Sequence, residues 1–167
     1  MSTTQQLSQS TDLFHDLSDE ELEIIASAAL TRRLGSGDSL CSKGEEGQSL
    51  FVIVSGALNV TRSAGGAPVP LATLRPGESC GEMSITTGGP RVADLVAVED
   101  SEVLEITRAR LDQALAGHPR MAGRFWHSVA VVLARRLERT NNLVAEYVDI
   151  NKRLIEDDEF RRFYATL

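Results

Sequence analysis

The stretch SLFVIVSGALNVTR, residues 49–62, decides the fold class of this chain. Two runs rich in β-branched residues, 49–55 and 57–62, flank Gly56, which is typical of two strands joined by a tight turn. The same pattern of short β-branched runs extends from Thr31 to Ile106, where glycine and proline separate further runs at 69–74, 92–98 and 101–106. Many short strands at close spacing predict an antiparallel barrel or jelly roll, because parallel strands need intervening helices.

Helical patterns flank this strand-rich region. Ser18 and Glu21 form a capping-box signature that begins a short amphipathic helix, and Thr107 is a suitable N-cap for a second one. The longest helix is expected from Pro119 to about Asp149, followed by a short helical tail over 151–167. Residues 1–10 are polar and are expected to form a disordered tail. The predicted class is therefore α+β, mainly β, with a β-roll over about 31–106.

The long helix carries two apolar stripes. The first has the alternating four- and three-residue spacing of a coiled-coil seam: Trp126, Ala130, Leu133, Leu137, Thr140, Val144 and Tyr147. The second lies beside it: Phe125, Val129, Val132 and Leu143. One stripe can pack on the barrel while the other faces a second copy, so we expect a homodimer through this helix. A single broad apolar face that packs within one monomer is the alternative.

Composition excludes several classes of protein. The 167 residues are 42% hydrophobic, which is ordinary for a globular protein, and no run is long enough to span a membrane. The net charge of −7 disfavours DNA and anionic membranes as partners. Cys41 and Cys80 stand far apart and the three histidines are scattered, so we expect reduced thiols in a cytoplasmic protein and no metal site. No pattern of an enzyme's nucleophile and base is present.

The segment PGESCGEMSITTGGPRVA, residues 76–93, carries the most chemical information. Gly81 allows close approach of a backbone, and Arg91 offers a permanently charged fork after a glycine-rich loop. Loop N–H groups and an arginine suit an anion, while the Glu82 carboxylate suits a hydroxyl donor such as a ribose 2′-OH. A surface ion pair explains the same residues, and both interpretations stay open at this point.

The chain resembles the cyclic nucleotide-binding domain family of bacterial catabolite activators, kinase regulatory subunits and nucleotide-gated channels. The resemblance places the domain at 11–142, with 143–167 as the end of the long helix and the tail. The motifs that carry it occur in order: Gly44-Glu45-Glu46-Gly47, Leu50 to Gly56, Pro76-Gly77-Glu78, Gly81-Glu82-Met83, Pro90-Arg91-Val92-Ala93 and Ala134-Arg135-Arg136-Leu137. The fold it implies is an eight-stranded antiparallel β-roll (jelly roll), flanked by an N-terminal helix and a long C-terminal helix with a short helical tail.

The resemblance also implies a ligand and the residues that bind it. Residues 81–93, here called the cassette, look like the family's phosphate-binding segment. Arg91 would pair with the cyclic phosphate, assisted by backbone N–H groups near Ser84 and Val92 or Ala93. Glu82 would accept from the ribose 2′-OH, helped by the Gly81 and Met83 backbone, and Thr140 and Asn141 would meet the base. Thr140 also occupies a seam position, where a hydroxyl is costly unless a ligand or partner satisfies it.

Departures from the family pattern sharpen the choice of ligand. Val92 lacks the hydroxyl that guanine-preferring members often carry there, which favours cAMP, with cGMP as the second candidate. Asp94 stands where Ser, Thr or an apolar residue is commoner, and a carboxylate that faced the cyclic phosphate would repel it. A cyclic dinucleotide is the alternative ligand. Cys80 replaces a usual phenylalanine without removing a ligand contact.

The resemblance predicts a non-enzymatic receptor that stands alone. Residues 143–167 are too few for the DNA-binding domain of a catabolite activator, and Met1 with its polar lead-in favours a complete small protein. We therefore expect a cytoplasmic sensor, without cofactor, that signals to an unidentified protein effector through ligand-induced movement of its C-terminal helices. The alternative is a nucleotide-free interaction or dimerisation module of the same fold.

Overall fold

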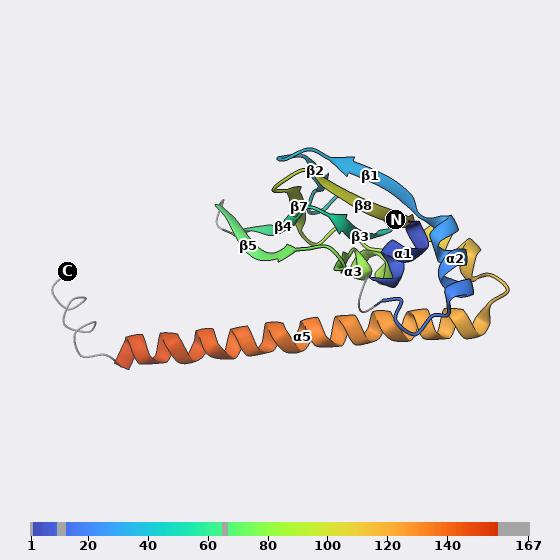
Figure 1. The fold of residues 1–167 in the computed structure, drawn as a ribbon. Coiled ribbons are helices and arrows are strands. Elements are labelled where there is room, and N and C mark those ends of the chain that lie inside the picture. Colours follow the sequence, from blue (N-terminus) through green and yellow to red (C-terminus); the bar gives the residue numbers. More distant parts are fainter. Residues whose placement is uncertain (1, 10–12, 65–66, 157–167) are drawn as a thin grey trace. The chain divides into compact units, whose positions relative to one another are not determined.

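The computed structural model describes residues 2–9, 13–64 and 67–156 (Figure 1). The chain divides into two compact units, residues 1–130 and 131–167. Within the described residues of the first unit, eight strands form two antiparallel four-stranded sheets. The first sheet has the order β1 (Leu30–Leu34), β8 (Ser101–Thr107), β3 (Ser49–Ser55) and β6 (Ser79–Cys80). The second has the order β2 (Ser39–Cys41), β7 (Asp94–Ala97), β4 (Leu58–Ala64) and β5 (Ala67–Leu74). The predicted jelly roll is confirmed.

Strand β3 is buried on both of its faces, which explains its unbroken apolar sequence. Phe51 and Ile53 belong to the core between the two sheets. Leu50 and Val52 alternate with them, are fully buried on the other face, and pair in register with Ile106 and Leu104 of β8. Because successive side chains of a strand point to opposite faces, a strand covered on both sides has no polar alternation.

The core between the sheets is built from residues of nearly every strand. Its buried members are Leu34, Leu40, Cys41, Phe51, Ile53, Leu58, Leu74, Cys80, Leu95, Ala97 and Val103. The turn from β3 to β4 depends on Gly56, which has φ +78°. A Cβ atom there would lie 2.2 Å from Oγ of Ser101, so only glycine fits this turn.

Five helices accompany the sheets in the described part of the chain: α1 (Thr3–Ser8), α2 (Asp19–Ala28), α3 (Glu82–Thr87), α4 (Arg108–Leu115) and α5 (Pro119–Glu156). The capping box predicted at Ser18 and Glu21 is confirmed, since each side chain bonds the backbone N–H of the other residue. Thr107 is the N-cap of α4, also as predicted. None of the helices described is long and apolar enough to cross a membrane.

The prediction of a disordered tail over residues 1–10 is wrong for residues 3–8, which form α1. Ser2 and Gln5 make a second capping box at its start. Leu7 is fully buried, although the residues around it are polar. Burial of this one apolar side chain therefore holds a segment that its composition alone would leave unfolded.

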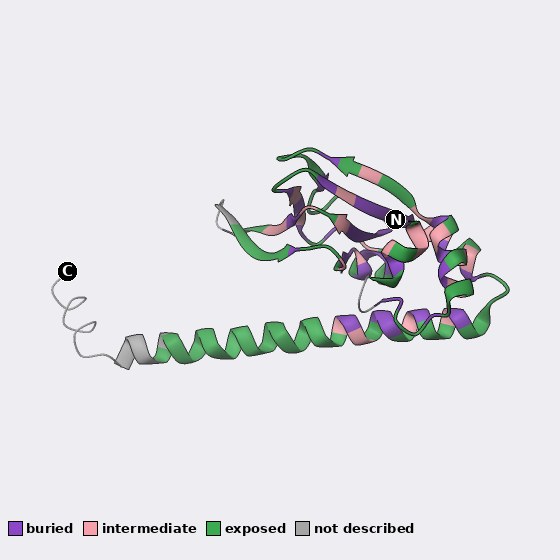
Figure 2. Cartoon of the chain, viewed as in Figure 1, coloured by how far each residue is buried: buried purple, intermediate pink, exposed green. Residues whose placement is uncertain are grey.

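Helix α5 is longer than predicted, because it continues without a break through Asp149 to Glu156. Residues 157–167, where most of the predicted helical tail falls, lie outside the described residues. Figure 2 shows buried residues in the first turns of α5 and exposed residues farther along. In the first unit, the buried Phe125 packs against Phe14, with 6.0 Å between ring centroids. In the second unit, the seam residues Leu137, Val144 and Tyr147 are exposed.

Candidate functional site

The cassette begins with a sharp turn that only glycine can make. Gly81 follows β6 with φ +92° and is the N-cap of α3. A Cβ atom at this position would lie 2.3 Å from the carbonyl oxygen of Ser49 and 3.0 Å from Nη1 of Arg91. The turn therefore brings the start of α3 directly beside the guanidinium group that the sequence predicts as the anion-binding residue.

The side chain of Arg91 is buried and oriented by β3. Only 7% of the residue is exposed, and its Nη1 donates to the carbonyl oxygen of Ser49 at 2.8 Å. The guanidinium carbon lies 4.9 Å from the centroid of the Phe51 ring, within the range of a cation–π contact. A Cβ atom on Gly47 would lie 3.1 Å from Nε of Arg91, so this glycine makes room for the fork.

The loop 42–48 is docked on the cassette by backbone hydrogen bonds. Gly44 N–H donates to the Arg91 carbonyl at 2.8 Å, and Arg91 N–H donates to the Glu45 carbonyl at 2.9 Å. Lys43 N–H donates to Oδ1 of Asp94 at 2.8 Å. The Asp94 carboxylate is thus bonded to the loop and holds it beside Arg91.

Two polar side chains at the start of α3 are buried. Glu82 is 1% exposed and its carboxylate accepts a hydrogen bond from the Ser79 hydroxyl. Ser84 is 2% exposed, and its hydroxyl donates to the Pro90 carbonyl at 3.4 Å. Buried polar groups of this kind are held by their partners and rarely move singly.

The remaining predicted cassette residues differ in exposure. Met83 and Val92 are large apolar side chains that are 48% and 47% exposed, while Ala93 is buried. The structure brings residues 81–84 and 91–93 together around Arg91, as the sequence predicts for one site. Exposed apolar side chains next to a buried cation suit a ligand that has both an anionic group and a flat apolar face.

Charges near Arg91 also act on Cys41. Burial raises the pKa of the Cys41 thiol, the Arg91 guanidinium opposes this, and the carboxylates of Glu45 and Asp94 add to it. The thiol is therefore neutral at physiological pH. One cation and two carboxylates thus act on the Cys41 thiol, in opposite directions.

Thr140 and Asn141 lie on α5 in the second unit, and both are exposed. The Thr140 hydroxyl donates to the Arg136 carbonyl of its own helix at 2.9 Å. The expectation that this hydroxyl needs a ligand or partner is wrong, because its own helix satisfies it. Its assignment to the base stays a prediction that rests on the family resemblance.

Sequence reasoning missed the residues that hold the predicted ones in place. Ser49 fixes the Arg91 fork, Ser79 bonds Glu82, and Gly47 makes room for the guanidinium. The only signal for Gly47 was the motif Gly44-Glu45-Glu46-Gly47, quoted for the family but not assigned to the site. Ser79 precedes Glu82 by three residues, a spacing at which a hydroxyl reaches the first turn of a helix.

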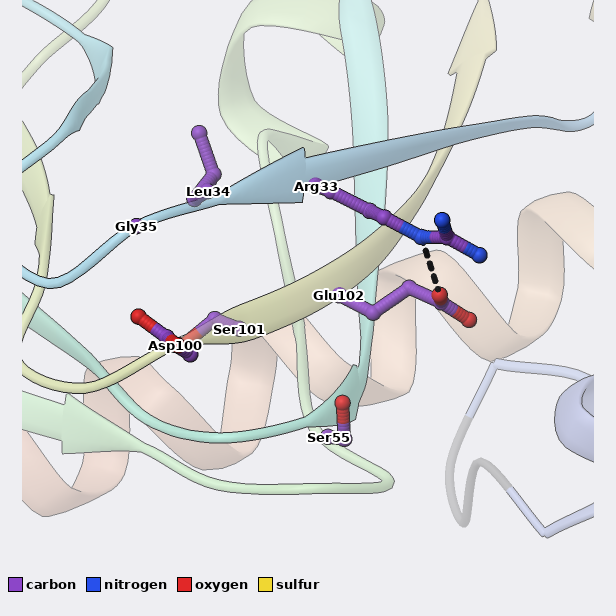
Figure 3. Close-up of a pocket in the computed structure, with 7 residues that line it drawn as sticks. All are labelled: Arg33, Leu34, Gly35, Ser55, Asp100, Ser101 and Glu102. Carbon is purple, nitrogen blue, oxygen red and sulfur yellow. Dashed lines mark hydrogen bonds and ion pairs between the residues drawn. The ribbon is translucent and has the colours of Figure 1, made fainter.

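A shallow hollow of about 380 Å³ lies elsewhere, at one end of β1 and β8 (Figure 3). It is lined by Arg33, Leu34, Gly35, Ser55, Asp100, Ser101 and Glu102. Its charged groups are already paired within the protein: Arg33 with Glu102 at 3.2 Å, and Asp100 with the Ser36 N–H at 3.1 Å. The cassette, where the buried cation Arg91 precedes the exposed apolar side chain of Val92, is therefore the candidate site.

The sequence profile described as "Cyclic nucleotide-binding domain" matches residues 31–118, more than half of the chain. The "Cyclic AMP receptor protein" of Thermus thermophilus is 37% identical over 130 residues, which are 77% of this chain and 58% of that protein. A "CRP-like cAMP-activated global transcriptional regulator" of Mycobacterium tuberculosis is 32% identical over 133 residues, 76% of this chain and 58% of that protein. The chain spans less than two thirds of the length of these relatives.

Solved structures agree with the sequence comparison. The crystal structure of the Thermus thermophilus catabolite activator protein superimposes with a TM-score of 0.73 and 35% identity, covering 83% of this chain and 63% of that one. A cyclic nucleotide-binding domain from Methylobacillus flagellatus gives a TM-score of 0.79 over 86% of this chain and 83% of that one; at 24% identity it supports the fold alone. This chain belongs to the cyclic nucleotide-binding domain family.

Proposed function

We propose that this protein is a non-enzymatic receptor for cAMP. The observation that carries the proposal is the Arg91 guanidinium, 7% exposed and held beside Gly81 and the start of α3 by the Ser49 carbonyl. A buried cation with its fork fixed in advance is suited to one phosphodiester anion. The relatives named as a cyclic AMP receptor and a cAMP-activated regulator support the choice of ligand.

Each predicted residue has a role in this proposal. Arg91 pairs with the cyclic phosphate, and backbone N–H groups near Ser84 and Val92 or Ala93 assist it. Glu82 accepts from the ribose 2′-OH, with the backbone of Gly81 and Met83 beside it. The base meets Thr140 and Asn141. Val92 offers no hydroxyl to a guanine, so cAMP is preferred to cGMP.

Calorimetric titration with cAMP, cGMP and cyclic di-GMP tests the proposal. We expect micromolar or tighter binding of cAMP, about 8 kcal/mol of binding free energy, and its loss in Arg91→Ala. Arg33→Ala is the matched control, because Arg33 is exposed in the hollow of Figure 3 and pairs with Glu102. This control removes one positive charge and keeps affinity.

Three outcomes would overturn parts of the proposal. Equal affinity in Arg91→Ala and the unaltered protein would refute the cassette assignment. Binding of cyclic di-GMP alone would change the ligand class. No binding by folded protein to any of the three would favour the nucleotide-free interaction module.

We further propose that the receptor is a cytoplasmic homodimer whose C-terminal helices move on binding and act on a protein effector. The exposed seam side chains Leu137, Val144 and Tyr147 support the dimer, because a stripe at this spacing matches a second helix. The two buried thiols are compatible with a reducing compartment.

Sedimentation equilibrium tests the dimer. Val144→Glu puts a charge in the seam and is expected to give monomers. Asn142→Glu adds the same charge about 200° around the helix and leaves the dimer intact. Monomeric unaltered protein at micromolar concentration would overturn this part of the proposal.

A further inference from the structure

Arg108, the first residue of α4, joins two elements that are far apart in sequence. Its Nη1 donates to the Ile85 carbonyl of α3 at 2.7 Å. Its guanidinium carbon also lies 5.2 Å from the centroid of the Trp126 ring in the first turns of α5. One side chain thus contacts both the cassette helix and the start of the long helix, and all of these residues lie within the first unit.

The Ile85 carbonyl needs a partner from outside its helix. It lies in the last turn of α3, where an intrahelical bond would come from the Gly89 N–H. That N–H instead donates to Oγ1 of Thr87 at 3.1 Å. A guanidinium takes its place, and a cation is favourable at the carbonyl end of a helix.

Besides the Ile85 carbonyl and the Trp126 ring, the Arg108 guanidinium has a third partner. Its Nε lies 2.8 and 2.9 Å from the two carboxylate oxygens of Asp112, one turn along α4. The Arg108 backbone N–H donates to the Gln48 carbonyl at 2.7 Å, and the Gln48 side chain in turn donates to the Gly88 carbonyl at 3.3 Å. Because α4 follows β8 directly, these bonds hold Arg108 at the end of the sheet.

The segment that Arg108 contacts is a short helix bounded by two glycines. Helix α3 lies between Gly81 and Gly88, which have φ +92° and +71°, a left-handed conformation that glycine adopts without strain. A ligand drawn onto Arg91 and Ser84 contacts α3 at its first turn, while Arg108 contacts its last turn. Movement of α3 changes the distance between the Ile85 carbonyl and the fork that lies over Trp126.

We propose that Arg108 is a positioning residue that couples occupation of the cassette to the first turns of α5 through Trp126. This inference rests on the proposed function, since it requires a ligand that binds better to one position of α3 than to another. The coupling is reciprocal, so a change in the packing of Trp126 also changes the affinity of the cassette.

The experiment uses Trp126 as its own reporter, because it is the single tryptophan of the chain. Emission is followed while cAMP is added to the unaltered protein, to Arg108→Lys and to Asp112→Asn, with calorimetry in parallel. Lysine keeps the charge but cannot bond Ile85 and Asp112 while it stacks on an indole. Arg110→Lys is the matched control, since Arg110 lies on the same helix and donates to the Ala28 carbonyl at 3.2 Å instead.

We expect a cAMP-dependent change in emission in the unaltered protein and in Arg110→Lys. In Arg108→Lys this change is lost, although calorimetry still detects binding, and in Asp112→Asn it is reduced. A merely structural role for Arg108 would alter the starting emission but not its response to ligand. Binding with a full response in Arg108→Lys would overturn the coupling alone. Absence of binding in the unaltered protein would overturn the proposed function and the coupling with it.

Discussion

Nη1 of Arg91 lies 2.8 Å from the carbonyl oxygen of Ser49, a residue 42 positions earlier in the chain. This bond uses one of the five N–H donors of the guanidinium and fixes the plane of the rest. A strand of the rigid sheet therefore sets the direction in which the cation of the cassette faces. We therefore expect this position to need the planar fork of arginine as well as its charge.

Arg91→Lys is expected to lower cAMP affinity by about 10- to 100-fold, because a charged hydrogen bond contributes about 1.5–3 kcal/mol and lysine has no planar fork. Calorimetry measures the affinity, and thermal unfolding checks that the fold is kept. Unchanged affinity would show that only the positive charge matters.

Asp94→Ala is expected to reduce both stability and affinity. The substitution leaves the Lys43 N–H without its acceptor, which costs about 1 kcal/mol of unfolding free energy, and it loosens the loop that bonds the Arg91 backbone. Asp100→Ala is the control, since Asp100 accepts from the Ser36 N–H in the hollow away from the cassette. It loses comparable stability in denaturant titration and keeps its affinity. Tighter binding in Asp94→Ala would mean that this carboxylate repels the ligand.

Gly81→Ala is expected to lose more than about 2 kcal/mol of unfolding free energy, because φ +92° is strained for alanine and its Cβ would meet the Ser49 carbonyl. Gly123→Ala on α5 is the opposite case, since no neighbouring atom lies within 4 Å of a Cβ there. Alanine is the better helix former by about 0.5–1 kcal/mol, so that variant is more stable. Urea unfolding of both variants makes the comparison, and an equal effect of the two would contradict it.

The Glu21 carboxylate is expected to contribute to the loss of fold stability in acid. The Ser18 backbone N–H and the Arg124 guanidinium hold the pKa of the Glu21 carboxyl below its usual value of 4.5, and outweigh the opposing effect of burial. A lowered native pKa stabilises the fold above pH 4.5, and this contribution is lost as the pH falls through the native value. Glu21→Gln keeps a hydrogen-bond acceptor without the charge, so its melting temperature approaches that of the unaltered protein in acid. Glu20→Gln, exposed in the same turn, is the control; an equal effect of both substitutions would refute the assignment.

Local signals identified much of this fold. The run 49–62 gave β3 and the start of β4, and the capping box at Ser18 marked the start of α2 correctly. The same signature, Ser2 with Gln5, begins α1, but a single apolar residue, Leu7, did not outweigh the polar composition around it. The sequence does not predict helix α3, because Ile85, Thr86 and Thr87 have β-branched side chains that favour strands. Contacts from other elements hold this helix, such as the bond from Arg108 to the Ile85 carbonyl.

The candidate site also contains residues that the sequence indicates and residues that it does not. Residues 81–84 and 91–93 lie within one short segment, so the sequence predicts that they lie close together; their roles toward a ligand stay predictions that the family resemblance implies. Ser49 acts through a backbone carbonyl, which every residue has, and no pattern could single it out. Asp94 was noticed as a departure, but the direction of its carboxylate is decided by a loop 51 residues away.

The two buried thiols lie in different sheets, Cys41 on β2 and Cys80 on β6. An alkylating reagent reaches a thiol only when its surroundings open and the thiolate can form. The rate at which each cysteine is alkylated in the native protein therefore reports how often the sheet that contains it opens. Mass spectrometry of the two separate peptides would tell whether the two sheets open together or one at a time, with no residue of the chain replaced.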